Sequence, residues 1–473
     1  MVCFEWLCYT RDLFIGGEHM RKIKLDLLNG VIWQQILLFF FPVLFGTLFQ
    51  QLYNTVDAIV VGNYIGKEAL AAVGGSTGTL LNLVTGFCIG LGSGATVVVA
   101  QFYGNHSTKR VGTTVSTGMI LSVSLGIVLT AAGIILAPTM LKMLNVPDDV
   151  FDLSRIYLRI FFLGLVPTLI YNTGAGVLRA IGDSRRPLYF LIASCIANII
   201  LDLCFVVIFR WGVNGAAAAT VISQCISCFL TLFVLGTTDD CYHFSFQHLS
   251  FDKQLLKQIV VIGLPSGIQS CLYSVANLFI QSSVNTFGTD TVAAYTAFGK
   301  IDALFWNTSN SLGTAMLTFT GQNFGAGNIE RVKKGFFQGN VIFVSMSLLI
   351  SFICYFFGRP IYGLFTTDAN VINIGVVMMQ AMCPFWFTFT FVEIYSTGIR
   401  ACGDPVVPMI MTALGVAVLR ILWIIFYPAE TILQVLTCYP LSWILTSILF
   451  WIYYHQGGWL KRCLRSRENI MKA

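Results

Sequence analysis

Acidic side chains inside long apolar stretches are the residues of this chain whose positions most need a chemical explanation. Asp57 and Asp202 both lie in such stretches, and Asn198 precedes Asp202 by four positions. A carboxylate at the centre of a bilayer costs roughly 2.5–3.5 kcal/mol on insertion scales, so it persists where it has a partner or a task. Residues four apart share one face of a helix, so we expect Asn198 and Asp202 to point the same way.

The predicted helices bring four polar side chains to a similar depth. Asp202 lies ~21 Å along its helix, and Thr220 lies ~10 Å along the next helix, which enters from the opposite side. Asp57 comes late on the first outgoing helix. We therefore expect Asp57, Asn198, Asp202 and Thr220 to converge in the outer half of the ~30 Å membrane core.

Two chemical interpretations of this convergence stay open. The oxygens of two carboxylates, an amide and a hydroxyl suit Na⁺, since hard cations prefer oxygen ligands. Two neighbouring carboxyl groups away from water also suit a proton, because both cannot stay charged cheaply. In a purely structural alternative, each acid only hydrogen-bonds a neighbouring helix, and Thr220 only bonds its own backbone.

Three further residues are candidates for supporting roles. Pro42 lies inside the first long apolar stretch. It cannot donate to the carbonyl of Leu38, so it should bend or weaken the helix there. Such a bend would connect the shape of the helix to the state of Asp57, and a static kink is the alternative. Asn172 and Glu393 are candidates for an additional polar site, with a structural hydrogen bond as the alternative for Glu393.

The composition places these residues in a membrane. Hydrophobic residues make up 56% of the chain and charged residues 11%, whereas soluble domains carry about 25% charged residues. A spanning helix needs about 20 mostly apolar residues, which predicts an all-α membrane protein with about twelve transmembrane helices. The predicted spans are 33–56, 78–100, 113–136, 156–178, 188–209, 213–235, 258–283, 292–319, 337–357, 373–398, 405–426 and 430–453.

The chain contains two related halves. Gln101, Gly104 and Arg110 recur as Gln322, Gly325 and Arg331, at a constant offset of 221 positions, and LRAIGDSRRP at 178–187 recurs as IRACGDPVVP at 399–408. Duplicated hydrophobic halves are typical of transporters, and an even helix number per half predicts a pseudo-two-fold axis along the membrane normal. The predicted parts are a cytoplasmic N-terminal segment 1–30, a six-helix bundle 31–235, a cytoplasmic linker 236–257, a six-helix bundle 258–453 and a basic tail 454–473. The glycine-rich run at 89–95 predicts close helix packing through small residues.

Lys and Arg residues set the predicted orientation. Most of the 28 lie in the N-terminal segment, the even-numbered connections and the C-terminal tail. The positive-inside rule then places both termini in the cytoplasm, with the chain in the plasma membrane. The net charge of +6 is explained by this topology, so we expect no nucleic-acid binding. The sequence leaves open whether Met1 or Met20 is the true start.

Several motifs resemble those of the multidrug and toxic compound extrusion (MATE) family over roughly residues 30–455. The motifs are GTAMLTFTGQNFGAGN, LRAIGDSRRP and IRACGDP, together with the segment from Pro42 to Asp57. The resemblance, to the DinF-like prokaryotic branch, implies two six-helix bundles around a V-shaped cleft and drug efflux in exchange for H⁺ or Na⁺. It also implies coupling roles for Asp57, Asn198, Asp202 and Thr220, and a role for Pro42. NorM-like and eukaryotic members carry an acid on helix 7, which this chain lacks at 258–283.

We therefore expect a secondary antiporter that exports amphipathic organic cations in exchange for H⁺ or Na⁺. A lipid-linked oligosaccharide flippase of the same superfamily is the alternative, although few basic residues lie in the spans, and a channel or sensor is a third class. We expect no enzymatic activity, no cofactor and no metal other than Na⁺ at the coupling residues. The expected partners are small cationic substrates and the bilayer, with the chain acting as a monomer.

Overall fold

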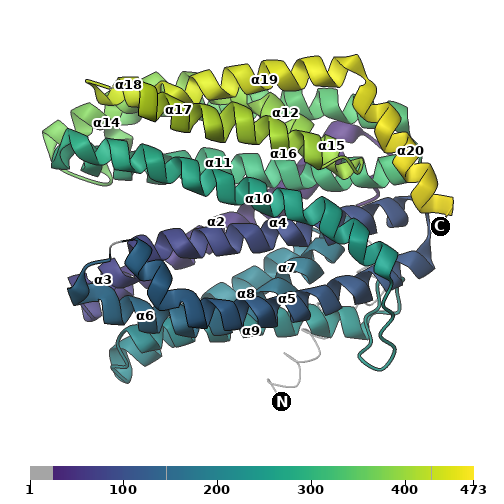
Figure 1. Ribbon diagram of the computed structural model, residues 1–473, viewed down its shortest axis with the longest axis horizontal. Helices are drawn as coiled ribbons and strands as arrows, with labels where there is room; N and C mark the ends of the chain where they lie inside the picture. The colour runs from purple at the N-terminus through teal and green to yellow at the C-terminus, as the bar shows by residue number, and fades with distance from the viewer. Residues whose placement is uncertain (1–24, 145, 428, 473) are drawn as a thin grey trace. The chain divides into compact units, whose positions relative to one another are not determined.

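The computed structural model describes residues 25–144, 146–427 and 429–472, and every regular element in these ranges is helical (Figure 1). Ten of these helices are long and apolar enough to cross a membrane. An eleventh crossing results if α6 (Asp148–Leu163) and α7 (Leu165–Ala180), which meet at an angle of 46°, count as one span. The all-helical membrane fold predicted from the sequence is confirmed.

The predicted span 292–319 lies in α11 (Thr289–Gly325), which is long enough to cross a membrane but too polar to qualify by composition. Asp290, Lys300 and Asp302 lie along it. The second part of α11 is buried almost continuously from Ser311 to Gly325. Neighbouring helices thus enclose much of this segment, and that enclosure explains how so polar a helix can stand in an apolar fold.

The described chain divides into two compact units. Unit 1 contains residues 25–28 and 41–267. Its helices are most of α2 (Ile32–Tyr64), α3 (Lys67–Gly74), α4 (Ser76–Gly104), α5 (Thr108–Met143), α6, α7, α8 (Arg185–Asp202), the π-helical η2 (Leu203–Ile208), α9 (Val213–Thr237) and the first part of α10 (Lys253–Val284).

Unit 2 contains residues 29–40 and 268–472 of the described chain. Its elements are the start of α2, the rest of α10, η3 (Asn285–Phe287), α11, α12 (Ile329–Phe356), α13 (Gly358–Gly363), α14 (Ala369–Met382), η4 (Cys383–Phe389), α15 (Thr390–Ala401), α16 (Val406–Thr412), the π-helical η5 (Ala413–Val418), α17 (Leu419–Phe426), α18 (Ile432–Leu436), α19 (Cys438–Gln456) and α20 (Gly458–Lys472).

Two helices change units part-way along their length, and each does so beside a proline. α2 passes from unit 2 to unit 1 after residue 40, next to Pro42, and α10 passes from unit 1 to unit 2 after residue 267, close to Pro265. Each helix continues through its proline without a break. Within unit 2, Arg331 holds the start of α2 by donating to Gly30 O at 2.9 Å and to Gln35 Oε1 at 2.7 Å.

Glycines allow α4 and α10 to pack backbone against backbone inside unit 1. A Cβ atom on Gly94 would lie 2.2 Å from a backbone oxygen of α10, and one on Gly263 would lie 2.4 Å from a backbone oxygen of α4. Gly90 and Gly267 repeat this contact one turn away, with a Cβ on Gly90 placed 2.5 Å from Gly267 N. The close packing predicted from the glycine-rich run at 89–95 is confirmed, and it is typical of membrane helices.

Candidate functional site

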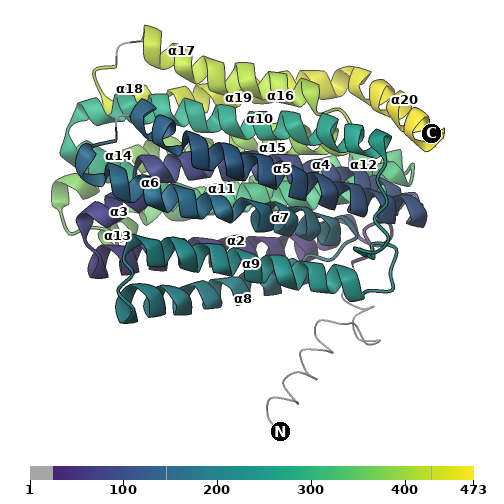
Figure 2. The same cartoon turned by 60° about the horizontal axis from the view of Figure 1, so that its bottom comes forward.

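The four predicted coupling residues lie on three helices of unit 1. Asp57 is on α2, Asn198 and Asp202 are on α8, and Thr220 is on α9. α8 and α9 run side by side in both views (Figure 1, Figure 2). The exposed fractions are 8% for Asp57, 1% for Asn198, 0% for Asp202 and 6% for Thr220. All four side chains are therefore withdrawn from solvent.

The carboxyl groups of Asp57 and Asp202 face each other closely enough to share a proton. No hydrogen-bond donor of the described chain reaches Asp57 Oδ1 or either oxygen of Asp202. The ion pairs of the described residues involve other acids, namely Asp152, Asp183 and Asp404. A pair of buried acids without a donor or a base is costly unless a proton or a cation joins it.

Two neutral groups complete the set of oxygens. Neither the Oδ1 nor the Nδ2 atom of Asn198 has a partner in the described chain. The Thr220 hydroxyl donates to Ala216 O at 3.1 Å, as the structural alternative expected. That bond uses the hydroxyl hydrogen and leaves the oxygen lone pairs available to a cation.

Two tyrosines beside the acids were missed by the sequence analysis. Tyr157 of α6 is 3% exposed, and its phenol interacts with Thr220 and lies within electrostatic range of both acids. Tyr53 of α2 also lies within range of both. Tyr53 precedes Asp57 by one helical turn, so its spacing was a usable signal. For Tyr157 there was none, because only the packing of α6 brings it to the site.

The helix that carries Asp202 changes from an α-helix to a π-helix at the site. The α-helical part of α8 ends at Asp202, and the following six residues, Leu203–Ile208, are π-helical. π-Helical turns are rare in proteins as a whole, and those that occur are frequently found at functional sites. A valine-rich apolar cluster that includes Val60, Val206 and Ala216 packs around the same helices and excludes water from them.

The remaining sequence candidates have hydrogen-bond partners of their own. Asn172 donates from Nδ2 to Thr168 O of its own helix at 2.9 Å. Glu393 belongs to unit 2 and accepts a hydrogen bond from Thr397 at 3.3 Å. The structure therefore brings Asp57 and Asp202 together, with Asn198 one helical turn from Asp202 on α8 and Thr220 beside Tyr157, which lies within electrostatic range of both acids.

A family model described as MatE matches residues 42–204 and 265–425, which is most of the chain. The chain belongs to the MATE family of transporters. A curated relative, "Probable multidrug resistance protein YoeA" of Bacillus subtilis, is 30% identical over 442 residues and covers 91% of this chain and 95% of its own. "Probable multidrug resistance protein NorM" of Thermotoga maritima is 23% identical and covers 97% of each chain.

Solved structures agree with the MATE fold. A structure titled "Outward-facing conformation of a multidrug resistance MATE family transporter of the MOP superfamily" matches with a TM-score of 0.85 at 23% identity, over 93% of this chain and 98% of that one. A MOP superfamily transporter from Pyrococcus furiosus matches with a TM-score of 0.84 at 23% identity, over 91% and 97%. This MATE family member is a multi-pass membrane transporter, not an enzyme.

Proposed function

We propose that this MATE family member is an antiporter that exports amphipathic organic cations in exchange for H⁺ or Na⁺. In this proposal the chain lies in the plasma membrane with both termini in the cytoplasm. Asp57 and Asp202 bind the coupling ion from the outer side, and Asn198 and Thr220 supply neutral oxygens. The single observation that carries the proposal is a buried pair of carboxyl groups without a donor or a base.

The energetics of the pair explain why it suits exchange. An empty, doubly charged pair in an apolar surrounding is unfavourable, so one positive guest must be present for most of the cycle. A proton, a Na⁺ ion or the charged end of an organic cation meets that need. Entry of one guest then favours departure of another, directly or through the shape of α2 around Pro42. A coupling ion loaded down its gradient thereby expels the drug.

Efflux from proteoliposomes tests the proposal. Proteoliposomes that contain the purified protein are loaded with ethidium. They are given a pH gradient or a Na⁺ gradient, one at a time, and dye release is followed by fluorescence. We expect one gradient to drive release in the wild type. Asp57→Asn should abolish gradient-driven release while insertion into the membrane is retained.

Asp152→Asn is the matched control, because Asp152 is 75% exposed and pairs with Arg155 on the surface of α6. It should transport like the wild type. Full gradient-driven release by Asp57→Asn would reject the assignment of the coupling site. Release that does not saturate and needs no counter-ion would indicate a channel. In cells that lack the protein, accumulation of cell-wall precursors without loss of drug protection would indicate a flippase.

A further inference from the structure

The first part of α2 lies in unit 2, although the chain on both sides of it belongs to unit 1. Before it, Leu25 N donates to Gly182 O of unit 1 at 3.2 Å. After it, the helix passes Pro42 and returns to unit 1, where it carries Asp57. Residues 29–40, called the connecting segment below, are therefore attached to unit 1 at both ends but belong to unit 2.

Arg331 of α12 fixes the connecting segment to unit 2. The hydrogen bonds that it donates, to Gly30 O at 2.9 Å and to Gln35 Oε1 at 2.7 Å, reach both the turn before α2 and the first turn of the helix. Its guanidinium also lies 5.5 Å from the centre of the Phe319 ring, on the buried part of α11. A planar guanidinium holds its acceptors in a fixed geometry, and its bonds are charge-assisted.

The acceptors of Arg331 are themselves held in place. Gly30 has a φ of +87°, a conformation that glycine adopts more readily than other residues. A Cβ atom on Gly30 would lie 2.9 Å from Gln35 Nε2, and that Nε2 atom donates to Asn29 O. The turn before α2 and the Gln35 side chain therefore form one attachment point for the guanidinium.

α10 crosses between the units in the opposite direction, with a weaker attachment. Its first part lies in unit 1, where the backbone N–H of Asp252 donates to Thr117 Oγ1 of α5 at 3.3 Å. That is one long bond between uncharged groups, whereas Arg331 donates two charge-assisted bonds. α10 also contains no Asp or Glu. Of the two helices shared by the units, α2 is therefore the one that can respond directly to the coupling ion.

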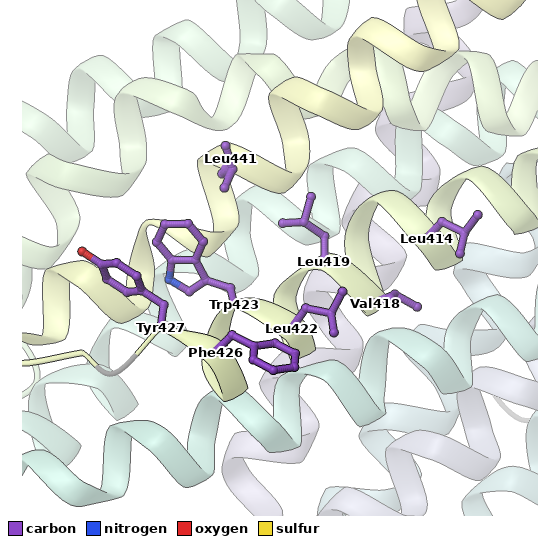
Figure 3. A pocket seen from close by; sticks show the side chains of 8 residues that line it. All are labelled: Leu414, Val418, Leu419, Leu422, Trp423, Phe426, Tyr427 and Leu441. Carbon is purple, nitrogen blue, oxygen red and sulfur yellow. The ribbon is translucent and has the colours of Figure 1, made fainter.

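Unit 2 itself offers the coupling ion fewer ligands than the acid pair does. An apolar groove of about 500 Å³ on α17 has no carboxylate among its lining residues, of which Trp423 and Tyr427 stack on each other (Figure 3). Glu393 and Asp302 each accept a hydrogen bond from a residue of their own helix. An ion bound in unit 1 therefore acts on unit 2 through a shared helix, and α2 carries Asp57.

We propose that the connecting segment transmits ion binding at Asp57 to unit 2, and that Arg331 is the positioning residue that makes the segment follow unit 2. Pro42 is the hinge between this segment and the part of α2 that carries Asp57, because proline removes a backbone hydrogen bond of the helix there. The inference rests on the proposed antiport and deepens it, since it names the link between the ion site and the second unit.

The attachment decides where a change in α2 goes. When a cation or proton joins Asp57 and Asp202, the second part of α2 can change its direction at Pro42. With the connecting segment fixed by Arg331, that change is passed to unit 2. Without Arg331, the connecting segment absorbs the change. Each guest then still binds, but the coupling free energy between ion and drug becomes smaller.

Ethidium binding measured at increasing concentrations of the coupling ion tests the inference, together with efflux from proteoliposomes. Fluorescence anisotropy in detergent gives the affinity, and we expect the ion to weaken ethidium binding to the wild type. Arg331→Gln should reduce that dependence at least about threefold and the maximal rate of gradient-driven efflux about tenfold, since it removes hydrogen bonds from a charged donor. Ethidium affinity without the ion should stay within about twofold, because the acid pair is unchanged.

Three further variants separate a positioning role from a structural one. Arg331→Lys should restore part of the ion dependence, because it returns the charge without the planar fork. Gln35→Leu removes one of the two acceptors and should cause a smaller loss of the same dependence. Lys333→Gln, at an exposed position on the same helix, is the matched control and should behave like the wild type.

Two outcomes overturn the inference alone. One is an Arg331→Gln variant that keeps the ion dependence and the efflux rate of the wild type. The other is a parallel fall of ion dependence, ethidium affinity without the ion and Tm, since Arg331 then only stabilises the fold. A wild type that releases no dye under either gradient overturns the proposed function, and the transmission through α2 with it.

Discussion

Arg462 Nη2 of α20 donates to Asp404 Oδ2 at 3.0 Å, across 58 positions of the chain. In the first half, the matching acid, Asp183, forms its ion pair with Arg186, three positions along, at 2.7 Å. Val407 stands in the second motif where the first has Arg186. The C-terminal helix therefore supplies the basic partner that the second copy of the motif has lost.

The two ion pairs should differ greatly in their contribution to stability. Asp183 is fully buried, so Arg186→Met removes the guanidinium that pairs with a buried carboxylate, which costs about 3–5 kcal/mol. The Arg462 side chain is 57% exposed, and the loss of such a pair costs about 0.2–1 kcal/mol. Thermal unfolding in detergent, followed by tryptophan fluorescence, measures both. A fall in Tm for Arg462→Met as large as that for Arg186→Met would contradict this ranking.

Gly313 on α11 makes room for the carboxyl group of Glu393. A Cβ atom at position 313 would lie 2.1 Å from Glu393 Oε1. Gly313→Ala should destabilise the protein by about 0.5–1.5 kcal/mol, because the flexible, half-buried Glu393 side chain must leave its rotamer. In a Glu393→Ala background the same change should be neutral or should stabilise by up to about 1 kcal/mol, since alanine favours a helix interior over glycine.

A double-mutant cycle of unfolding free energies measures this coupling. Gly299→Ala, also inside α11 but with open space around its Cβ position, is the control and should be tolerated in both backgrounds. Additive effects of the changes at 313 and 393 would show that the two residues do not compete for the same space.

Removal of the neutral oxygens of Asn198 and Thr220 should show whether Na⁺ or H⁺ is the coupling ion. Na⁺ binds to several oxygens at once, whereas a proton needs only a carboxylate. If Na⁺ drives transport, Thr220→Val and Asn198→Leu should each weaken Na⁺-driven efflux at least about tenfold, as loss of one ligand is worth more than about 1.4 kcal/mol. If H⁺ drives transport, both variants should keep most of the pH-driven efflux.

The apparent Na⁺ affinity of efflux, measured by titration of Na⁺ at constant pH, decides between these outcomes. Thr113→Val is the control, because Thr113 also donates to its own helix, at 3.2 Å, but lies on the exposed surface of α5. Na⁺-driven efflux that is unchanged in both site variants would remove Asn198 and Thr220 from the coupling site.

The reactivity of the Cys463 thiol should show whether α20 is packed against the rest of unit 2. Burial raises the pKa of its thiol to about 12, with a further rise from Asp404 that Arg462 opposes. The thiol is therefore neutral and inert at pH 7–9, because the thiolate is the reactive form. Because the pKa is raised in the folded state, this burial stabilises the docked helix fully below about pH 8.5, and the contribution is lost as the pH rises toward 12.

Maleimide labelling followed by mass spectrometry tests this behaviour. Cys463 should stay unlabelled between pH 7 and 9 in the folded protein and should react after unfolding in detergent and urea. Trp459→Ala removes the ring by which α20 packs against Phe336 and Tyr454, and should make Cys463 reactive without urea. Rapid labelling of the folded wild type would show that α20 is not docked as described.

Much of the fold could be read from local patterns. The long apolar runs predicted a helical membrane protein, because a bilayer satisfies no backbone hydrogen bonds and thus demands helices. The four-residue spacing of Asn198 and Asp202 predicted their common face, and the glycines at 89–95 predicted close packing. Each of these signals is contained in a stretch shorter than one helix.

Other features depended on how helices rotate and meet. No spacing in the sequence brings Tyr157 to the acid pair, Gly313 to Glu393, or Arg462 to Asp404. Helical periodicity is a property of consecutive residues, whereas contact between helices is set by their relative depth and rotation, and an error of a few residues at a boundary changes both.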